Sequence, residues 1–195
     1  MKKTFVILSI IFVSFLFQSC GAPTYISSWR SPNYKGGKLK KILVFAIVKD
    51  VIFRSAYEKK LSSDMKAVGV TGVSSLKLID YGSKITENEI KEIVDDGNFD
   101  GVLTLKYTKV KTTKFIVPGE TFYNDYWRGV EVIRTPGYVE IHKNVFMQSK
   151  LFSVKENKVI WVGQTETINA RSANDLATSL SKEITNNLIE EGIIK

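Results

Sequence analysis

The sequence is poor in the residues that build catalytic and metal sites, with one histidine and one cysteine among 195 residues. A single cysteine excludes an intramolecular disulfide, and zinc sites usually draw on several histidine or cysteine ligands. A Ser-His-Asp triad needs a base beside a reactive serine, and no Gly-x-Ser-x-Gly motif supplies that serine. The nucleotide-binding Gly-x-Gly-x-x-Gly and P-loop motifs are also missing from the sequence. We therefore expect no catalytic residues, no metal, no cofactor and no enzymatic activity.

The sequence also lacks an apolar run long enough to cross a membrane as a helix, which takes about 20 residues. The apolar run Phe5–Phe17 follows Lys2 and Lys3 and ends shortly before Cys20. A positive start, an apolar stretch of roughly 7–15 residues and a small residue at its end are typical of a secretory signal. The pattern resembles the lipobox of bacterial lipoproteins, in which the cysteine is acylated, for example with palmitate, and becomes the mature N-terminus. We therefore predict a lipoprotein signal peptide over 1–19 and lipidation at Cys20.

Positive charge predominates. The net charge is +8 for the whole sequence and +6 without the signal peptide, because 26 basic residues then face 20 acidic ones. Such a balance often indicates nucleic acid as a partner, but an exported, membrane-anchored chain meets little of it. We expect either anionic lipid headgroups and other envelope polyanions as partners, or a solvated lysine-rich surface without a specific partner.

The residues after the cysteine bear on the destination of the chain. Gly21 and Ala22 follow Cys20, and no aspartate or acidic cluster stands there. By analogy with the sorting signals of lipoproteins, this predicts delivery to the outer membrane with the domain facing the periplasm.

The first third of the mature chain predicts a tether, a strand and a helix. Residues 20–38 are rich in Gly, Pro and Ser without a period, which indicates a lipidated tether. Lys41–Val48 is apolar throughout, as in a central strand covered on both faces. Ser55 and Glu58 form a potential capping box, which predicts that a helix begins there, and Gly69 is expected to end it.

The rest of the chain predicts two more helices and three more long strands. Capping residues at Thr86 and Ser172 open the helices, and the second helix carries a leucine- and isoleucine-rich stripe at four-residue spacing. The predicted strands are 99–117, 138–154 and 158–168. The order β-α-β-α-β-β-β-α combines parallel crossover units with an antiparallel meander. We therefore predict a single α/β (α+β) domain over 39–195, with helices packed on a mixed sheet.

An insertion between two predicted strands, residues 118–137, is the most suggestive stretch of the sequence. It contains four aromatic residues and an arginine that could bind a partner: Phe122, Tyr123, Tyr126, Trp127 and Arg128. Tyrosine, tryptophan and arginine are the residues that dominate binding hot spots. Loops of this length are often functional or disordered, and disordered segments are poor in aromatic residues. Two interpretations stay open: a surface that binds a partner protein, and a hairpin extension folded back onto its own sheet.

Two other features could carry chemistry. His142 lies in an alternating stretch typical of a strand, where a lone histidine is usually structural or exposed to solvent. Asp50 and Arg54 follow the carboxyl end of the first predicted strand, the edge at which open α/β sheets bind ligands. For these two residues a structural ion pair is a simpler interpretation than a catalytic role.

A family resemblance rests on the order of several segments. The lipobox is followed by ILVFAIVKD, a helix bearing Arg54 and Glu58, the stretch Asn98–Leu103, and LFSV-x₄-VIWVGQTET. This pattern resembles small lipoproteins of Gram-negative bacteria, those of Bacteroidetes in particular. It is more distantly similar to the α/β domains of the curli secretion channel lipoprotein, the TolB amino-terminal domain and the lipoprotein activators of penicillin-binding proteins. The resemblance implies binding of other envelope proteins and transfers no catalytic residue.

The sequence thus favours a lipid-anchored envelope protein that binds or scaffolds a protein partner without catalysis. Two alternatives remain. The chain could be a subunit of an envelope export or assembly complex, or a hydrolase acting on an envelope polymer. A deep pocket with converging carboxylates would indicate the hydrolase, and a large exposed aromatic patch would indicate the complex. The oligomeric state does not follow from the sequence.

Overall fold

The computed structural model of the chain describes residues 22–80, 82–83, 86–126 and 129–195, with the backbone alone over most of 122–133. The predicted signal peptide 1–19, the predicted lipidation site Cys20, and Trp127 and Arg128 lie outside the described residues.

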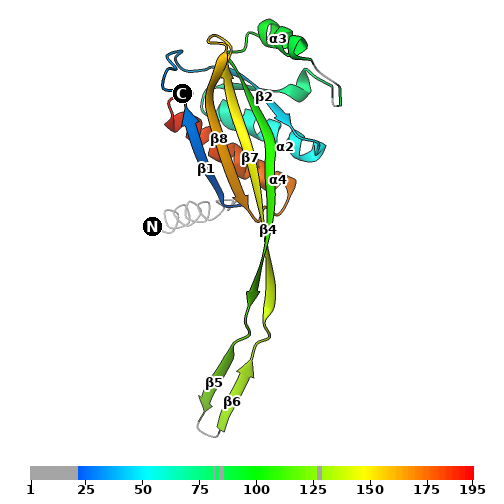
Figure 1. Cartoon of the computed structure of the whole chain (residues 1–195), viewed down its shortest axis with the longest axis vertical. Coiled ribbons are helices and arrows are strands. Elements are labelled where there is room, and N and C mark those ends of the chain that lie inside the picture. The colour runs from blue at the N-terminus through cyan, green and yellow to red at the C-terminus, as the bar shows by residue number, and fades with distance from the viewer. Residues whose placement is uncertain (1–21, 81, 84–85, 127–128) are drawn as a thin grey trace, which may run out of the picture.

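The domain is built on a six-stranded mixed sheet with the order β1-β8-β7-β4-β2-β3 (Figure 1). β2 runs parallel to both β3 and β4, whereas β4, β7, β8 and β1 pair in antiparallel succession. This arrangement confirms the predicted mixed sheet and its division into parallel and antiparallel parts. The strands are β1 (Thr24–Arg30), β2 (Lys41–Ile47), β3 (Thr71–Ser74), β4 (Gly101–Val117), β7 (Tyr138–Ser153) and β8 (Lys158–Ile168).

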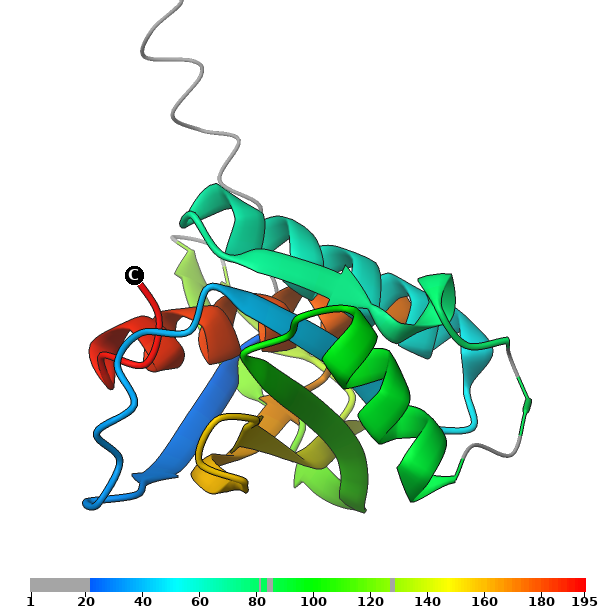
Figure 2. The ribbon, with the colours of Figure 1, turned by 90° about the horizontal axis from the view of Figure 1, so that it is seen from above.

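Helices cover both faces of the sheet (Figures 1 and 2). The main core joins α2 (Val51–Ala67) and α4 (Ala173–Glu190) to one face, and a smaller cluster joins α3 (Glu87–Asp96) to the other. β2 contributes to both, because Ile42 and Val44 belong to the main core while Leu43 packs in the cluster with α3. Strand residues alternate between faces, which explains why this segment is apolar without interruption.

The last helix follows its sequence pattern closely. Ser172 is the N-cap of α4 and accepts from the backbone N–H of Asp175. The stripe at four-residue spacing is buried against the sheet, and its members are Leu176, Leu180, Ile184 and Leu188. The Thr86–Glu89 capping box of α3 is present as well.

The predicted capping box at Ser55 and Glu58 is wrong. α2 begins one turn earlier, where Asp50 is the N-cap and accepts from the backbone N–H of Phe53 at 3.0 Å. Glu58 therefore lies inside the helix and is completely buried. A short 3-10 helix, η2 (Ser75–Lys77), follows β3 and packs near this glutamate.

The predicted tether needs a correction as well. Residues 24–30 form β1, which pairs with β8 along its whole length, from Thr24 opposite Thr167 to Arg30 opposite Trp161. β1 is an edge strand, and its outward residues Tyr25 and Trp29 are more than half exposed. A seven-residue strand with few aliphatic residues lacks the apolar signal that identified the other strands.

A long two-stranded ribbon projects from one end of the domain (Figure 1). β4 and β7 stay paired from Gly101 opposite Ser153 to Val117 opposite Tyr138. A second hairpin, β5 (Thr121–Tyr126) and β6 (Gly129–Arg134), continues it. We call residues 109–117 and 138–146 the stem, and residues 121–134 the tip.

Stem and tip meet at a tight junction of two proline-glycine pairs, Pro118-Gly119 and Pro136-Gly137. The two backbones approach so closely there that a Cβ on Gly119 would lie 2.3 Å from the carbonyl oxygen of Thr135. Only glycine fits at that distance, so the sequence of the junction is set by the close approach of the chains.

Candidate functional site

The stem is exposed because its two strands lose their outer neighbours. β2 ends where Ile47 pairs with Lys106 of β4, and β8 ends where Ile168 pairs with Asn144 of β7. Beyond these points β4 and β7 pair only with each other. The ribbon therefore carries its side chains away from the core, with both of its faces open.

A β-bulge marks the place where the ribbon leaves the sheet. The register shifts between Tyr107 and Lys109, so that Thr108 is the extra residue opposite Met147 and Phe146. An extra residue bends its strand and increases the local twist. The bulge thus separates the part of β4 that packs in the core from the part that forms the stem.

Exposed apolar side chains concentrate on the stem. It carries six of the thirteen large hydrophobic residues that are exposed in the described part of the chain: Val110, Phe115, Ile116, Tyr138, Val139 and Ile141. Ile116 is 82% exposed, the highest value among the thirteen. An apolar surface of this kind, rimmed by polar residues, is typical of a contact with a protein or a membrane.

The single histidine lies on this stem. The ring of His142 packs 4.8 Å from the ring of Phe115, and its Nε2 atom lies 2.7 Å from Glu140 Oε1. Both polar side chains are partly exposed. The strand position predicted for His142 is confirmed, and its surroundings are those of a surface pair beside an aromatic ring.

The most highly connected polar cluster is buried under α2. Glu58 Oε1 accepts from Arg54 Nε and from the backbone N–H of Ala46, each at 3.0 Å, and Oε2 accepts from the Ser74 hydroxyl at 2.7 Å. Ser75 and the backbone N–H of Leu76 also donate to this carboxylate. With Glu58 completely buried, the cluster connects α2 to β2, β3 and η2 and offers no surface to a substrate.

The expected ion pair between Asp50 and Arg54 is not the one that forms. Arg54 pairs with Glu58, one turn further along α2, and its guanidinium lies 5.2 Å from the ring centre of Phe45. Asp50 instead caps the helix. Arg54 therefore has a structural partner, as predicted, although the partner is a different acid.

The tip contains the residues predicted to bind a partner. Phe122 lies opposite Ile133 and Tyr123 opposite Val132 in the β5–β6 register, and Tyr126 ends β5 opposite Gly129. The hairpin continues away from the six-stranded sheet (Figure 1) and does not fold back onto it. The structure thus disfavours the interpretation of the insertion as packing against its own sheet.

The sequence analysis did not single out the stem itself. Its apolar residues Ile116, Val139 and Ile141 were assigned to strands, and exposure of a strand depends on where its neighbours end. A signal was present in Lys106–Val117, where lysines recur among apolar residues at a density unusual for a central strand.

The described residues contain neither a cluster of metal-ligating side chains nor a membrane-spanning helix. Within 22–80, 82–83, 86–126 and 129–195, no three His, Cys, Asp or Glu side chains gather as a group that could hold a metal ion. No helix in the same ranges is both long and apolar enough to span a membrane.

Comparison with known proteins yields distant structural similarity alone. No protein-family model matches the chain, and no curated protein sequence does. The PelC dodecamer from Paraburkholderia phytofirmans is 15% identical over 89% of this chain and 99% of its own, with a TM-score of 0.48. Lipoprotein GNA1162 from Neisseria meningitidis is 13% identical over 77% of this chain and 99% of its own, with a TM-score of 0.44. A PDZ domain protein from Parabacteroides distasonis is 8% identical over 96% of this chain and 40% of its own, with a TM-score of 0.39.

Proposed function

We propose that the chain is a cell-envelope lipoprotein, acylated at Cys20, that binds or scaffolds another envelope protein through the tip of its ribbon and catalyses no reaction. The single observation that carries the binding role is the tip, a hairpin of β5 and β6 that extends away from the six-stranded sheet and pairs with none of its strands. The apolar leader and its terminal cysteine support the anchor. Gly21 and Ala22 support delivery to the outer membrane with the domain facing the periplasm.

The tip is the proposed contact with the protein partner. Aromatic residues and arginine dominate the energetics of protein interfaces, and the tip combines Tyr123, Tyr126, Trp127 and Arg128 within six residues. Its backbone pairs only with itself within the described residues. A partner could therefore bind it without displacing any strand of the domain.

The anchor is tested by Cys20→Ala in the full chain. The substitution should abolish incorporation of a fatty-acid analogue and release the domain from membranes, because several acyl chains are needed for stable anchoring. Ser19→Ala, which leaves the cysteine in place, is the control and should keep full labelling. Unchanged labelling of the Cys20→Ala chain would rule out acylation at this residue.

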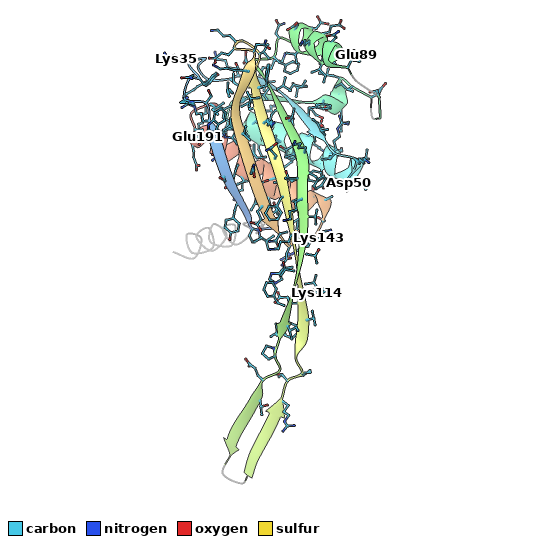
Figure 3. All side chains as sticks on the ribbon, viewed as in Figure 1. Lys35, Asp50, Glu89, Lys114, Lys143 and Glu191 are labelled. Carbon is cyan, nitrogen blue, oxygen red and sulfur yellow. The ribbon has the colours of Figure 1, made fainter. Side chains whose placement is uncertain are left out.

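The contact is tested with a photo-crosslinking amino acid in intact cells. Placed at Tyr123 or Tyr126 of the full chain, it should give a discrete protein adduct. Placed at Lys35, which is exposed and lies at the end of the domain opposite the ribbon (Figure 3), it should not. Equal adducts at all three positions, or none at the tip, would contradict the proposed role.

A further inference from the structure

Ala22, the first residue that the structure describes, lies beside the base of the stem. The backbone N–H of Ala22 donates to Asp175 Oδ1 of α4 at 3.2 Å, and the carbonyl of Pro23 accepts from Ile168 at the end of β8. The next residue, Asn169, donates to the carbonyl of Lys143 in the stem. Cys20 precedes Ala22 by two residues, which span at most about 7 Å. An anchor at Cys20 is therefore held close to the point where the ribbon leaves the sheet.

The pairing register assigns the stem residues to two faces. Residues directly opposite each other in an antiparallel pair share a face. One face carries the pairs Val110–Val145, Thr112–Lys143, Lys114–Ile141 and Ile116–Val139. This face is thus mostly aliphatic, with one lysine in each of the two middle pairs.

This aliphatic face lies on the side of the sheet that carries α4. Val110 and Lys143 line a cavity together with Ser172 and Leu176 from the start of α4. The same helix start holds Ala22 through Asp175. Anchor and aliphatic face are therefore on one side of the molecule. Among the described elements, only the strands of the ribbon, β4 to β7, extend beyond the stem's base at that end (Figure 1).

The charge of the stem is positive. It has four lysines and one acidic residue, Glu140, which is paired with His142. The four lysines are exposed: Lys109, Lys111, Lys114 and Lys143. Figure 3 shows Lys143 near the base of the stem and Lys114 further along it. A lysine can bury its aliphatic part beside apolar groups while its ammonium group reaches a polar headgroup.

We propose that the stem lies on the surface of the membrane that holds the anchor, with its aliphatic face in the interface and its lysines at the phosphates of anionic lipids. The inference rests on the proposed acylation of Cys20. Interfacial binding of this kind combines burial of apolar side chains with attraction to anionic headgroups. The anchor keeps the domain at the membrane, and the stem fixes the orientation of the domain on it. The tip then lies along the membrane surface, at a distance from the anchor.

An anionic lipid surface explains the stem better than a protein partner does, because two independent features point to it. The chain enters the domain at the stem's base, and the exposed lysines accompany the aliphatic residues on both strands. A protein partner for this face would need matching acidic groups and would have to fit between the stem and the anchored bilayer.

The test uses the acylated full chain in vesicles and a photo-crosslinking amino acid at Ile116 or Val139. Vesicles of phosphatidylglycerol with phosphatidylethanolamine should give lipid adducts at both positions, detected as a mass increase of the protein. Vesicles of phosphatidylcholine alone should give far fewer, and the exposed Lys35, at the end of the domain opposite the ribbon (Figure 3), should give none in either. Because each lysine near an anionic surface contributes roughly fivefold, Lys114→Gln combined with Lys143→Gln should weaken docking of the stem about 25-fold. Lys59→Gln with Lys182→Gln, exposed on α2 and α4, is the control and should change nothing.

The outcomes separate this inference from the proposed function. Fatty-acid labelling without lipid adducts at the stem would overturn the inference and leave the anchor intact. Absence of labelling would refute the anchor and, with it, the membrane position of the stem. Adducts to a protein in place of lipid, when the same crosslinkers are used in intact cells, would assign the stem to a protein interface and overturn the inference.

Discussion

Replacing the buried Glu58 tests whether the polar cluster under α2 determines the stability of the domain. Its carboxylate accepts from five donors, which belong to Ala46, Arg54, Ser74, Ser75 and Leu76. The N–H of Ala46 depends on it in particular, because β3 ends opposite Val44 and offers no further acceptor along β2. Removing the charge leaves Arg54, which is only 8% exposed, without its acid.

Breaking one partner of a buried ion pair costs about 3–5 kcal/mol. Glu58→Gln keeps one acceptor oxygen, so we expect a loss of about 3 kcal/mol in the free energy of unfolding. Glu58→Ala removes both oxygens and should lose about 5 kcal/mol. Domains of this kind are stable by only about 5–15 kcal/mol, so either loss should be measured easily in urea unfolding followed by circular dichroism.

Two further variants identify the physical cause. Lys60→Gln removes the partly exposed i,i+4 pair with Asp64 on the same helix and should cost less than about 1 kcal/mol. The double variant Arg54→Met, Glu58→Leu removes both charges but leaves the backbone N–H of Ala46 without an acceptor, at roughly 1–3 kcal/mol, whereas the N–H of Leu76 keeps the Ser74 hydroxyl. A double variant as stable as the wild type would refute the role of Glu58 as a backbone cap, and a Glu58→Gln loss as small as that of Lys60→Gln would refute the whole argument.

Three other substitutions probe the ribbon and the surface. Trp127→Ala should weaken binding of a partner by about thirtyfold, as for a hot-spot residue worth about 2 kcal/mol, while the melting temperature stays nearly constant; a collapse of melting would instead identify core packing. His142→Ala should leave partner recovery within a small factor, and a thousandfold loss with an intact fold would indicate an overlooked active site. The Lys158 ammonium, 2.8 Å away, and the N–H of Lys35 lower the pKa of Glu156. The advantage of the wild type over Glu156→Gln in urea unfolding should therefore be full at pH 7 and disappear as the pH falls below the ordinary glutamate pKa; an advantage that grows in acid would contradict this sign.

The sequence predicts the layers of this domain well, because its strongest patterns are local. The four-residue stripe from Leu176 to Leu188 and the continuous apolar run of β2 each report which faces an element buries. The caps at Thr86 and Ser172 are local too, and both are confirmed. A capping box also needs a helix that starts at its serine, and at Ser55 the earlier cap Asp50 determines the start.

The candidate site is less predictable, because it depends on distant parts of the chain. Whether Ile116 is buried depends on where β2 and β8 end, some 70 residues before and 50 after it in the sequence. β1 was missed for a related reason, since Tyr25 and Trp29 become strand residues only through pairing with β8. The aromatic composition of the tip is evident from the sequence, but the direction in which the ribbon points from the domain is not.

The proline-glycine junction between stem and tip has a consequence for how this protein can evolve. Prolines donate no backbone hydrogen bond, and the paired chains at Gly119 and Gly137 leave no room for side chains. At these two positions, therefore, no side chain can couple the packing of the tip to that of the stem. Substitutions in the tip can therefore be selected without a change in the folding of the domain. Proteins that share this domain can then differ in the partner they bind.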